Sequence, residues 1–426
     1  MVKIVLVGAG SSVFGYNSVL DAVNIPALNG AELMLHDIDE TRLNAMSGLA
    51  CRMNDETGAN LEINHAVDQE EALRDADFVL VSIEVERMKR WRQDWEIPFK
   101  HGIKQVIGEN GGPGGLFHTW RNLPPVLDIA YTMEEVCPDA WLLNYTNPVP
   151  RLCMAIDRYT DIKTVGLCHE VEHQLQRLAS LMGIPTAILD PVSAGLNHFS
   201  WYKELRLKDG TDAYPMLDEA LKKAKGFQPL CRAMYRQFGL YPSTDDNHLG
   251  EYLAYSWDAT PEKVRGLNWI NRCDEEGQRN WERINRLIEG KEPLAVKGKL
   301  SGERAMHIIA GIIGNSNHME LQVNMPNAGQ VSNLIKDAIV ETPAIINKGG
   351  IHPIQVGEMP EGLAALCNIQ IMVQSLVVEA GVSGNMGKAK QALLVDPVVN
   401  DQEKALAAFD ELMRVHSELL PQFEVE

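Results

Sequence analysis

The chain has 426 residues and a formal net charge of −19, with 45% hydrophobic and 23% charged residues. These proportions are typical of a globular protein long enough for two domains, and the acidic balance argues against nucleic acid or an anionic membrane surface as a partner. No apolar run approaches the length of a membrane span, and strand-like sequence starts at Val2 with no signal peptide before it. We therefore expect a cytoplasmic protein without a membrane partner.

The seven cysteines form no C-x-x-C pair, so neither a disulfide framework nor a structural zinc site is indicated. We expect free thiols in a reducing compartment, one of which has a functional role. The cysteines are Cys51, Cys137, Cys153, Cys168, Cys231, Cys273 and Cys367.

The N-terminus carries a partial dinucleotide-binding fingerprint. Residues 2–7 form a nearly continuous apolar run, typical of a strand buried on both faces of a parallel sheet. The run leads into Gly8-Ala9-Gly10-Ser11-Ser12 and a helical pattern over residues 14–23. Glycines at such a turn let the backbone approach a pyrophosphate, and the helix N-terminus supplies N–H donors. The third glycine of the fingerprint is absent, with Val13 in its place, although Gly15 lies close by.

An acidic residue ends the second predicted strand. Residues 32–39 are typical of a strand and contain Asp37, which lies 27 residues beyond Gly10. A carboxylate there would bind the adenosine ribose hydroxyls and repel a 2′-phosphate, which favours NAD over NADP. The alternative is a solvated acid at a strand end.

Two further strands continue the alternation of strand and helix that is typical of a doubly wound sheet. They are predicted at residues 78–83 and 141–145. Ligands of such sheets bind beyond the carboxyl ends of the strands. This rule selects residues 82–86, 144–148 and 168–169 as the rim of one site, with Ser82 as a further cofactor contact.

A glycine-rich segment separates these two strands. Residues 108–115 contain five glycines in the pattern GENGGPGG, and a helical pattern follows directly and continues over residues 123–136. So many glycines indicate either a disordered linker or a loop whose backbone must come close to a ligand. We favour the ordered loop because a helix begins directly after it.

Cys168 and His198 are the candidate metal ligands. Each follows a short apolar run, and a helix-like segment and a second strand-like run lie between them, so the two can meet in space. Taken alone, each also fits a purely structural role: a cysteine is often a small buried hydrophobic residue, and a histidine is often a polar residue with its hydrogen bonds made. Their combination with a nucleotide-binding start and a polar segment downstream indicates one divalent metal.

That polar segment is Asp245-Asp246-Asn247-His248, a loop entering a helix. The dipole at a helix start favours ionised acids, so an N-cap role is the alternative to catalysis, and the two are compatible. The remaining predicted elements are a hairpin-type insertion at 199–207, helices within 216–238, a solvated helix at 272–291, a buried helix at 301–313, strands near 321–327 and 335–346, and a long apolar helix at 362–382.

Six segments together carry a family resemblance. They are Val7-Gly8-Ala9-Gly10-Ser11, Gly112-Pro113-Gly114-Gly115, Asn144-Tyr145-Thr146-Asn147-Pro148, Gly166-Leu167-Cys168-His169-Glu170-Val171, Gly195-Leu196-Asn197-His198 and Val323-Asn324-Met325-Pro326-Asn327. In order and spacing the chain resembles, over essentially its whole length, the NAD- and metal-dependent glycosidases of glycoside hydrolase family 4.

The resemblance implies that Cys168 and His198 bind Mn²⁺, that Asn147 contacts substrate, and that the glycine loop and Asp37 hold NAD. The Cys168-His169-Glu170-Val171 form is similar to members that act on unphosphorylated α-glycosides. The downstream Asp246-Asn247-His248-Leu249 is most similar to the α-galacturonidases, with α-galactosidase or α-glucuronidase as alternatives. One departure is Asp245-Asp246, where relatives carry Gly-Asp.

The resemblance also implies a redox-assisted elimination, an exception to the usual two-carboxylate mechanism. The sugar is oxidised at C3, a base removes the C2 proton, the C1 substituent departs, and water addition and reduction restore the ring. We expect Asp246 as the base, with Asp245 as the second candidate, and His169 or His248 assisting the leaving group.

An α-galacturonide substrate requires a cation near its C6 carboxylate. Arg87, His118, Arg121 and His248 are the candidates, and the alternative is that they are solvated or bind the NAD pyrophosphate.

We expect an α/β protein with a Rossmann-like NAD-binding domain over residues 1–196. An α+β domain for substrate, metal and oligomer contacts is expected over residues 197–426, in a homodimer or homotetramer. Two other classes remain open: an NAD-dependent 2-hydroxyacid dehydrogenase and a non-catalytic NAD-sensing regulator.

Overall fold

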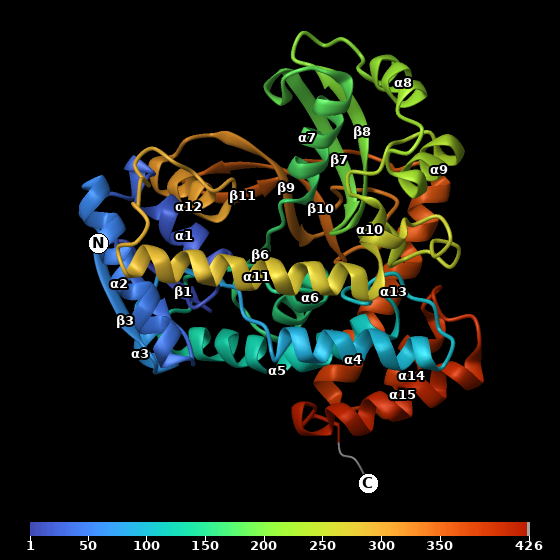
Figure 1. The fold of residues 1–426 in the computed structure, drawn as a ribbon, viewed down its shortest axis with the longest axis horizontal. Coiled ribbons are helices and arrows are strands. Elements are labelled where there is room, and N and C mark those ends of the chain that lie inside the picture. The colour runs from blue at the N-terminus through green and yellow to red at the C-terminus, as the bar shows by residue number, and fades with distance from the viewer. Residues whose placement is uncertain (424–426) are drawn as a thin grey trace.

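The computed structural model describes residues 1–423, which fold around one mixed β-sheet (Figure 1). Its eleven strands run in the order β3-β2-β1-β4-β5-β6-β9-β10-β7-β8, with β11 paired to β10. The expected α/β class is confirmed. One half of the sheet is parallel and the other antiparallel, and the two halves meet between β6 and β9.

The parallel half is the Rossmann-like part of the fold. Alternate residues of its first strand face opposite sides: Ile4 and Leu6 pack with α1, α2 and α12, whereas Val5 and Val7 pack with α3, α5 and α6. This explains the unbroken apolar run. The strands are β1 (Lys3–Val7), β2 (Glu32–His36), β3 (Glu62–Ala66), β4 (Phe78–Val81), β5 (Trp141–Asn144) and β6 (Lys163–Gly166). The helices on its two faces are α1 (Phe14–Ala22), α2 (Glu40–Thr57), α3 (Gln69–Leu73), α5 (Gly112–Val136), α6 (Val149–Tyr159) and α12 (Ala305–Gly314).

The antiparallel half carries the second part of the chain. Its strands are β7 (Leu189–Leu196), β8 (Phe199–Leu207), β9 (His318–Pro326), β10 (Ile339–Asn347) and β11 (Gly350–Pro353). β7 and β8 form a hairpin, and the domain boundary expected at residue 196 falls in its turn. Since one sheet runs through both halves, the division into two domains stays a prediction.

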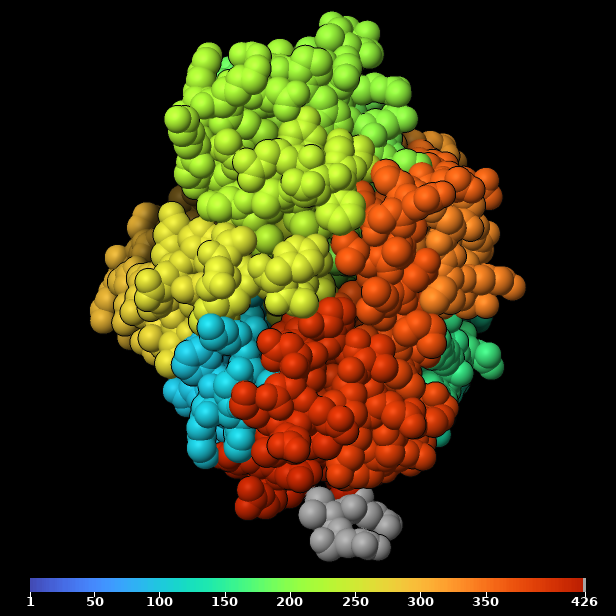
Figure 2. Space-filling view, turned by 90° about the vertical axis from the view of Figure 1, so that its right-hand side faces the viewer, coloured from blue at the N-terminus to red at the C-terminus, as the bar shows by residue number. Residues whose placement is uncertain are grey.

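The remaining helices cover the hairpin and the lower part of the molecule. Figure 2 shows this side, with residues 200–250 above and the C-terminal helices below. The helices are α4 (Arg87–Lys100), α7 (Glu170–Met182), α8 (Tyr214–Lys223), α9 (Pro229–Phe238), α10 (Asp246–Gly250), α11 (Gly266–Ile288), α13 (Glu361–Ser383), α14 (Met386–Val395) and α15 (Gln402–His416).

α5 begins earlier than its sequence pattern indicates. The helical pattern was clearest from residue 123, but the helix starts at Gly112, inside the glycine-rich segment, and contains Pro124 and Pro125. Prolines usually mark a helix boundary, which hides the continuity of this one. Residues 105–123 are buried, so the ordered-loop interpretation of the glycine segment is confirmed.

By length and composition, α13 is long and apolar enough to cross a membrane, so the expectation that no apolar run approaches that length was wrong. However, 56% of its most apolar window is buried within the protein. The helix packs against α5, α6 and α14, as the core helix of a folded domain does.

Candidate functional site

Gly8 and Gly10 lie at the carboxyl end of β1. Gly8 has φ +86°, and a Cβ there would lie 2.3 Å from the backbone oxygen of Ser82, at the end of the neighbouring β4. A Cβ on Gly10 would lie 2.7 Å from Oδ2 of Asp37. The turn therefore brings bare backbone and the carboxyl ends of three strands to one place, as a dinucleotide requires.

Gly15 takes the role of the third glycine. A Cβ at this position would lie 2.1 Å from the carbonyl oxygen of Ala9, so only glycine lets α1 pack this closely on the turn. Val13, at the fingerprint position, is 37% exposed and has no such constraint. The close packing of helix on turn that the third glycine of the fingerprint allows is thus present, with that glycine displaced by two residues.

Asp37 is held by the glycine turn itself. Its Oδ2 accepts a hydrogen bond from the Gly10 N–H at 2.8 Å, and its Oδ1 accepts one from Asp39 N–H at 2.9 Å. Ser11 Oγ accepts from the N–H of Phe14 at 3.2 Å and so caps α1, while Ser12 lies half-buried beside it. This arrangement fits a dinucleotide with a ribose at the carboxylate.

The fold brings Cys168 and His198 together from opposite halves of the sheet. Cys168 follows β6, His198 lies in the β7–β8 turn with φ 132°, and Cys168 Sγ is 3.2 Å from His198 Nε2. Burial lowers the pKa of His198, with a further contribution from His248, which keeps the imidazole neutral. Burial and Glu341 raise the pKa of the Cys168 thiol, so its thiolate needs a compensating cation.

A buried carboxylate lies behind this pair. Glu341 on β10 is 2% exposed and accepts hydrogen bonds from Asn197, Ser200 and Asn324, on the β7–β8 hairpin and β9, at 2.9–3.2 Å. Burial raises its pKa. The network ties β7, β8, β9 and β10 together beneath the site.

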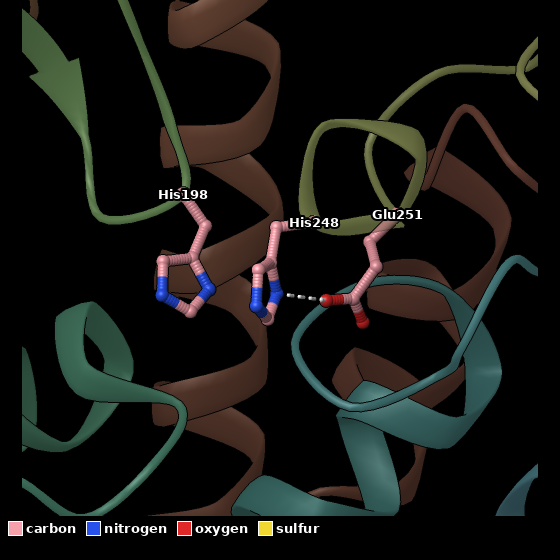
Figure 3. Close-up of side chains that lie close together, drawn as sticks. All are labelled: His198, His248 and Glu251. Atoms are coloured by element: carbon pink, nitrogen blue, oxygen red, sulfur yellow. Dashed lines mark ion pairs between the residues drawn. The ribbon is translucent and has the colours of Figure 1, made fainter. Parts of the chain in front are cut away.

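His248 and Glu251 approach His198 from α10 and the residue after it (Figure 3). One ligand atom from each of the three residues lies within 4.8 Å of the others, which is a possible metal-binding geometry. The rings of His198 and His248 are 4.2 Å apart. Burial would lower the pKa of His248, but the carboxylates of Glu251, Asp245 and Glu170 offset this and raise it to about 9. We keep Cys168 and His198 as the candidate pair, because Sγ and Nε2 already lie 3.2 Å apart, and treat His248 as its neighbour.

The two adjacent acids have different environments. Asp246 is 3% exposed, and its Oδ1 accepts from the N–H of Cys231 at 2.9 Å, in the first turn of α9. Burial raises its pKa to about 6. Asp245 is half-buried, lies 3.6 Å from Arg177, and keeps Oδ1 without a partner. Asp246 Oδ2 has no partner within the described residues either, so each acid keeps one free carboxylate oxygen. The two differ in how they are held: Asp246 is fixed by the Cys231 N–H, whereas Asp245 has the longer ion pair with Arg177.

His169 and Asn147 lie at the rim predicted from the strand ends. His169 Nδ1 is 3.3 Å from Glu303 Oε1, and its ring stacks loosely on Phe14 of α1, with centroids 6.4 Å apart. Burial would lower the pKa of His169, but Glu303 offsets this and raises it. Asn147 is half-buried, and its carbonyl accepts from the Asn122 side chain at 3.2 Å.

The cations proposed for a C6 carboxylate are paired with acids of the chain itself. Arg87 lies 2.8 Å from Glu84 and 2.7 Å from Glu109. His118 lies 2.5 Å from Glu84, whose pKa falls to about 2 because these two cations outweigh the effect of burial. Arg121 is 2% exposed and binds Asp94 through both terminal nitrogens. Both terminal nitrogens of Arg121 are thus used by Asp94, while its Nε has no partner within the described residues.

Several buried polar atoms near the pair have no partner within the described residues. A native interior leaves few such atoms, and a group of them marks the place of a ligand, ion or water. They are Asn110 Oδ1, Asn197 Oδ1, Asp245 Oδ1, Asp246 Oδ2, Asn247 Nδ2, His248 Nδ1 and Glu303 Oε2. Sequence reasoning missed Asn110, Glu251 and Glu303; only Asn110, inside the glycine motif, had a signal.

Comparison with known proteins identifies the class. The model of the family 4 glycosyl hydrolases matches residues 3–184, and that of their C-terminal domain matches residues 193–399. The chain therefore belongs to family 4 of the glycosyl hydrolases. This membership separates it from the 2-hydroxyacid dehydrogenases and from a non-catalytic regulator.

Relatives named for different activities align over nearly the whole chain. An α-glucosidase of Erwinia rhapontici is 34% identical, covering 96% of this chain and 97% of the relative. An α-galactosidase of Bacillus subtilis is 33% identical over 100% of both chains. An α-galacturonidase of Thermoanaerobacterium saccharolyticum is 29% identical, covering 93% of this chain and 92% of the relative.

A solved structure of a 6-phospho-α-glucosidase from gut microorganisms, in complex with NAD and Mn²⁺, has the same fold. Its TM-score is 0.86 at 22% identity, covering 99% of this chain and 100% of that one.

Proposed function

We propose that this chain hydrolyses α-hexosides with an uncharged C6 group, using NAD⁺ and a divalent metal, Mn²⁺ in particular. The observation that carries the sugar class is the close pairing of three of the four candidate cations, Arg87, His118 and Arg121, with acids of the chain. Family membership supports the glycosidase activity, and the relatives' names support an α-linked substrate.

The residues present fit both groups. The bare backbone at Gly8 and Gly10, with Asp37 beside it, suits a dinucleotide. Cys168 and His198, with unpartnered polar atoms around them, suit a metal, although a thiolate is a soft ligand for a hard ion such as Mn²⁺. When bound, NAD⁺ would accept a hydride from sugar C3 and return it, while the metal would hold the 2- and 3-oxygens and acidify the C2 proton.

The chain's own part in the reaction is proton transfer and orientation. We assign the C2 base to Asp245, the second of the two candidates from sequence, because its ion pair with Arg177 is long, at 3.6 Å, and leaves the carboxylate able to turn toward a substrate. Asp246 also keeps Oδ2 without a partner within the described residues, but its Oδ1 is fixed by the Cys231 N–H at 2.9 Å. His169, oriented by Glu303, is the group available to protonate the leaving oxygen.

An uncharged C6 group follows from the electrostatics of the site. Arg177, the remaining cation near the acids, lies 2.6 Å from Glu170 and 3.6 Å from Asp245. A uronide would bring another carboxylate among these acids, where His248, 3.7 Å from Glu251, is the most loosely paired of the candidate cations. Burying a carboxylate without a cation dedicated to it is costly. The α-glucoside and α-galactoside avoid this cost.

The test compares p-nitrophenyl α-glucoside, α-galactoside and α-galacturonide with NAD⁺, Mn²⁺ and a thiol reductant. We expect kcat/KM for one of the neutral sugars to exceed that for the galacturonide by at least about tenfold, the equivalent of 1.4 kcal/mol. A preference for the galacturonide would contradict the uncharged-sugar proposal and restore the α-galacturonidase prediction. Cleavage of none of the three would contradict the α-glycosidase proposal.

A further inference from the structure

Glu251 is the residue after α10, and its carboxylate binds the backbone of residues 109–111 in the glycine-rich segment. The side chain is 1% exposed. Its Oε2 accepts hydrogen bonds from three consecutive backbone N–H groups, those of Glu109 at 2.7 Å, Asn110 at 2.6 Å and Gly111 at 3.3 Å. Three donors converging on one buried carboxylate oxygen make a strong, charge-assisted anchor.

The backbone at Glu251 presses on the same loop. A Cβ on Gly111 would lie 2.2 Å from the Glu251 carbonyl oxygen, so glycine is required for this approach. The loop and the end of α10 thus fit together through both backbone and side chain.

The second carboxylate oxygen connects this anchor to the candidate metal pair. Asn110 Nδ2 lies 3.2 Å from Glu251 Oε1 and 3.4 Å from Nδ1 of His198. His248 Nδ1 lies 3.7 Å from the same Oε1, and Figure 3 shows the His248 ring between Glu251 and His198. Glu251 therefore fixes both neighbours of the His198 ring on the side away from Cys168.

We propose that Glu251 is a positioning residue for the metal. It holds the backbone of Asn110, together with His248, against His198, and so keeps His198 Nε2 directed toward Cys168 Sγ. Metal binding at Nε2 places the His198 proton on Nδ1, where Asn110 Oδ1, which has no partner within the described residues, is the acceptor once the amide turns. This inference rests on the proposed metal at Cys168 and His198, and adds the contacts that orient one of its ligands. Residues that orient a metal-binding histidine commonly change metal affinity by tenfold to a hundredfold when they are removed.

A direct ligand role fits Glu251 less well. Its Oε2 already accepts three N–H groups, and its Oε1 faces Asn110 and His248. A metal on this carboxylate would have to displace the loop that it holds.

The test is a titration of the nucleotide-free protein with Mn²⁺ alone, followed by electron paramagnetic resonance of the free ion. Glu251→Gln keeps the size of the side chain and removes its charge, and we expect Mn²⁺ to bind about tenfold to a hundredfold more weakly. Hydrogen–deuterium exchange at the amides of residues 109–111 should speed up in the same variant. Glu320→Gln is the matched control, since Glu320 is equally buried and pairs with Arg304 instead; it should bind Mn²⁺ as the wild type does.

The outcomes separate this inference from the proposal beneath it. Equal Mn²⁺ affinity in Glu251→Gln and wild type would overturn the positioning role while leaving the metal site standing. Weaker binding with unchanged exchange at residues 109–111 would make Glu251 a ligand and overturn the role in holding the loop. No Mn²⁺ binding by the wild type would contradict the metal proposal itself.

Discussion

The parallel and antiparallel halves of the sheet are held together in different ways. In the parallel half, β1 is buried on both faces by apolar side chains, and its ligand-facing turn consists of Gly8 and Gly10 with an acid from the next strand. In the antiparallel half, strands far apart in sequence meet around the buried carboxylate of Glu341. The structure of the parallel half therefore follows from short apolar runs and their turns. The antiparallel half depends on polar contacts between residues far apart in the sequence.

The candidate metal pair spans the boundary between these halves, and losing it should have the largest effect. Cys168→Ser and His198→Ala should each remove metal-dependent activity, about a thousandfold or more, because metal assistance is worth several kcal/mol. Far-ultraviolet circular dichroism should show the fold retained. Cys51→Ser, at an exposed free cysteine, is the control and should keep full activity.

Peroxide should inactivate the wild type through Cys168, and dithiothreitol should restore it while oxidation remains at the reversible stage. Full activity of Cys168→Ser would show that Cys168 is not a metal ligand.

The next largest effect should distinguish the two adjacent acids. Asp245→Asn should lower kcat by about a hundredfold to ten-thousandfold, the range for loss of a general base, and should abolish solvent deuterium incorporation at C2 of the product. Asp246→Asn should mainly cost stability, about 1 kcal/mol, because it weakens the contact to the start of α9. An inactive Asp246→Asn beside an active Asp245→Asn would return the base to Asp246.

A smaller effect is expected in the parallel half, at the nucleotide turn. Gly8→Ala combines a positive φ with a Cβ 2.3 Å from the Ser82 oxygen, about 3 kcal/mol of strain in all, and should weaken NAD⁺ binding by about a hundredfold. Gly48→Ala in α2 is the matched control, since its Cβ meets nothing within 4 Å and should stabilise the helix by about 0.5–1 kcal/mol. Calorimetric titration measures the NAD⁺ affinity of both variants, and Gly48→Ala should bind NAD⁺ as the wild type does. Unchanged affinity in Gly8→Ala would place the nucleotide elsewhere.

The smallest effect concerns stability alone, at the join of α1 and the segment before α12. Burial raises the pKa of Asp21 to about 6, although the Ser301 N–H and hydroxyl bind its carboxylate. The folded protein therefore keeps the Asp21 proton to higher pH than the unfolded chain does. Its contribution to stability is full below about pH 4 and is lost as pH rises toward 6.

Between pH 4.5 and pH 7 the wild type should lose roughly 2 kcal/mol of unfolding free energy relative to Asp21→Asn. Urea unfolding at the two pH values measures the difference. Parallel pH profiles of wild type and variant would show that Asp21 has an ordinary pKa.

The same contrast between the two halves of the sheet explains which parts of the fold and of the site the sequence predicts. The apolar run before Gly8, the acid at Asp37 and the meeting of Cys168 with His198 were all predicted from local patterns and spacing. β3 was missed because Glu62–Ala66 is largely polar and only its last residue is buried. Glu251 and Glu341 gave no signal, since each is a lone acid and most of the groups that donate to it lie about 140 residues away. The pairing of Arg121 with Asp94 gave no signal either, because Asp94 belongs to a different helix.

The most direct test of the account counts glycosidic bonds cleaved per NAD⁺. Enzyme stripped of nucleotide is mixed with Mn²⁺ and an α-hexoside that the complete enzyme cleaves. A stoichiometric amount of NAD⁺ is then added, and sugar release and absorbance at 340 nm are followed together. We expect no cleavage before NAD⁺ is added, then many bonds cleaved per NAD⁺ without NADH accumulation, because the hydride taken from C3 is returned. One NADH per bond, or full cleavage without NAD⁺, would contradict the redox-neutral mechanism.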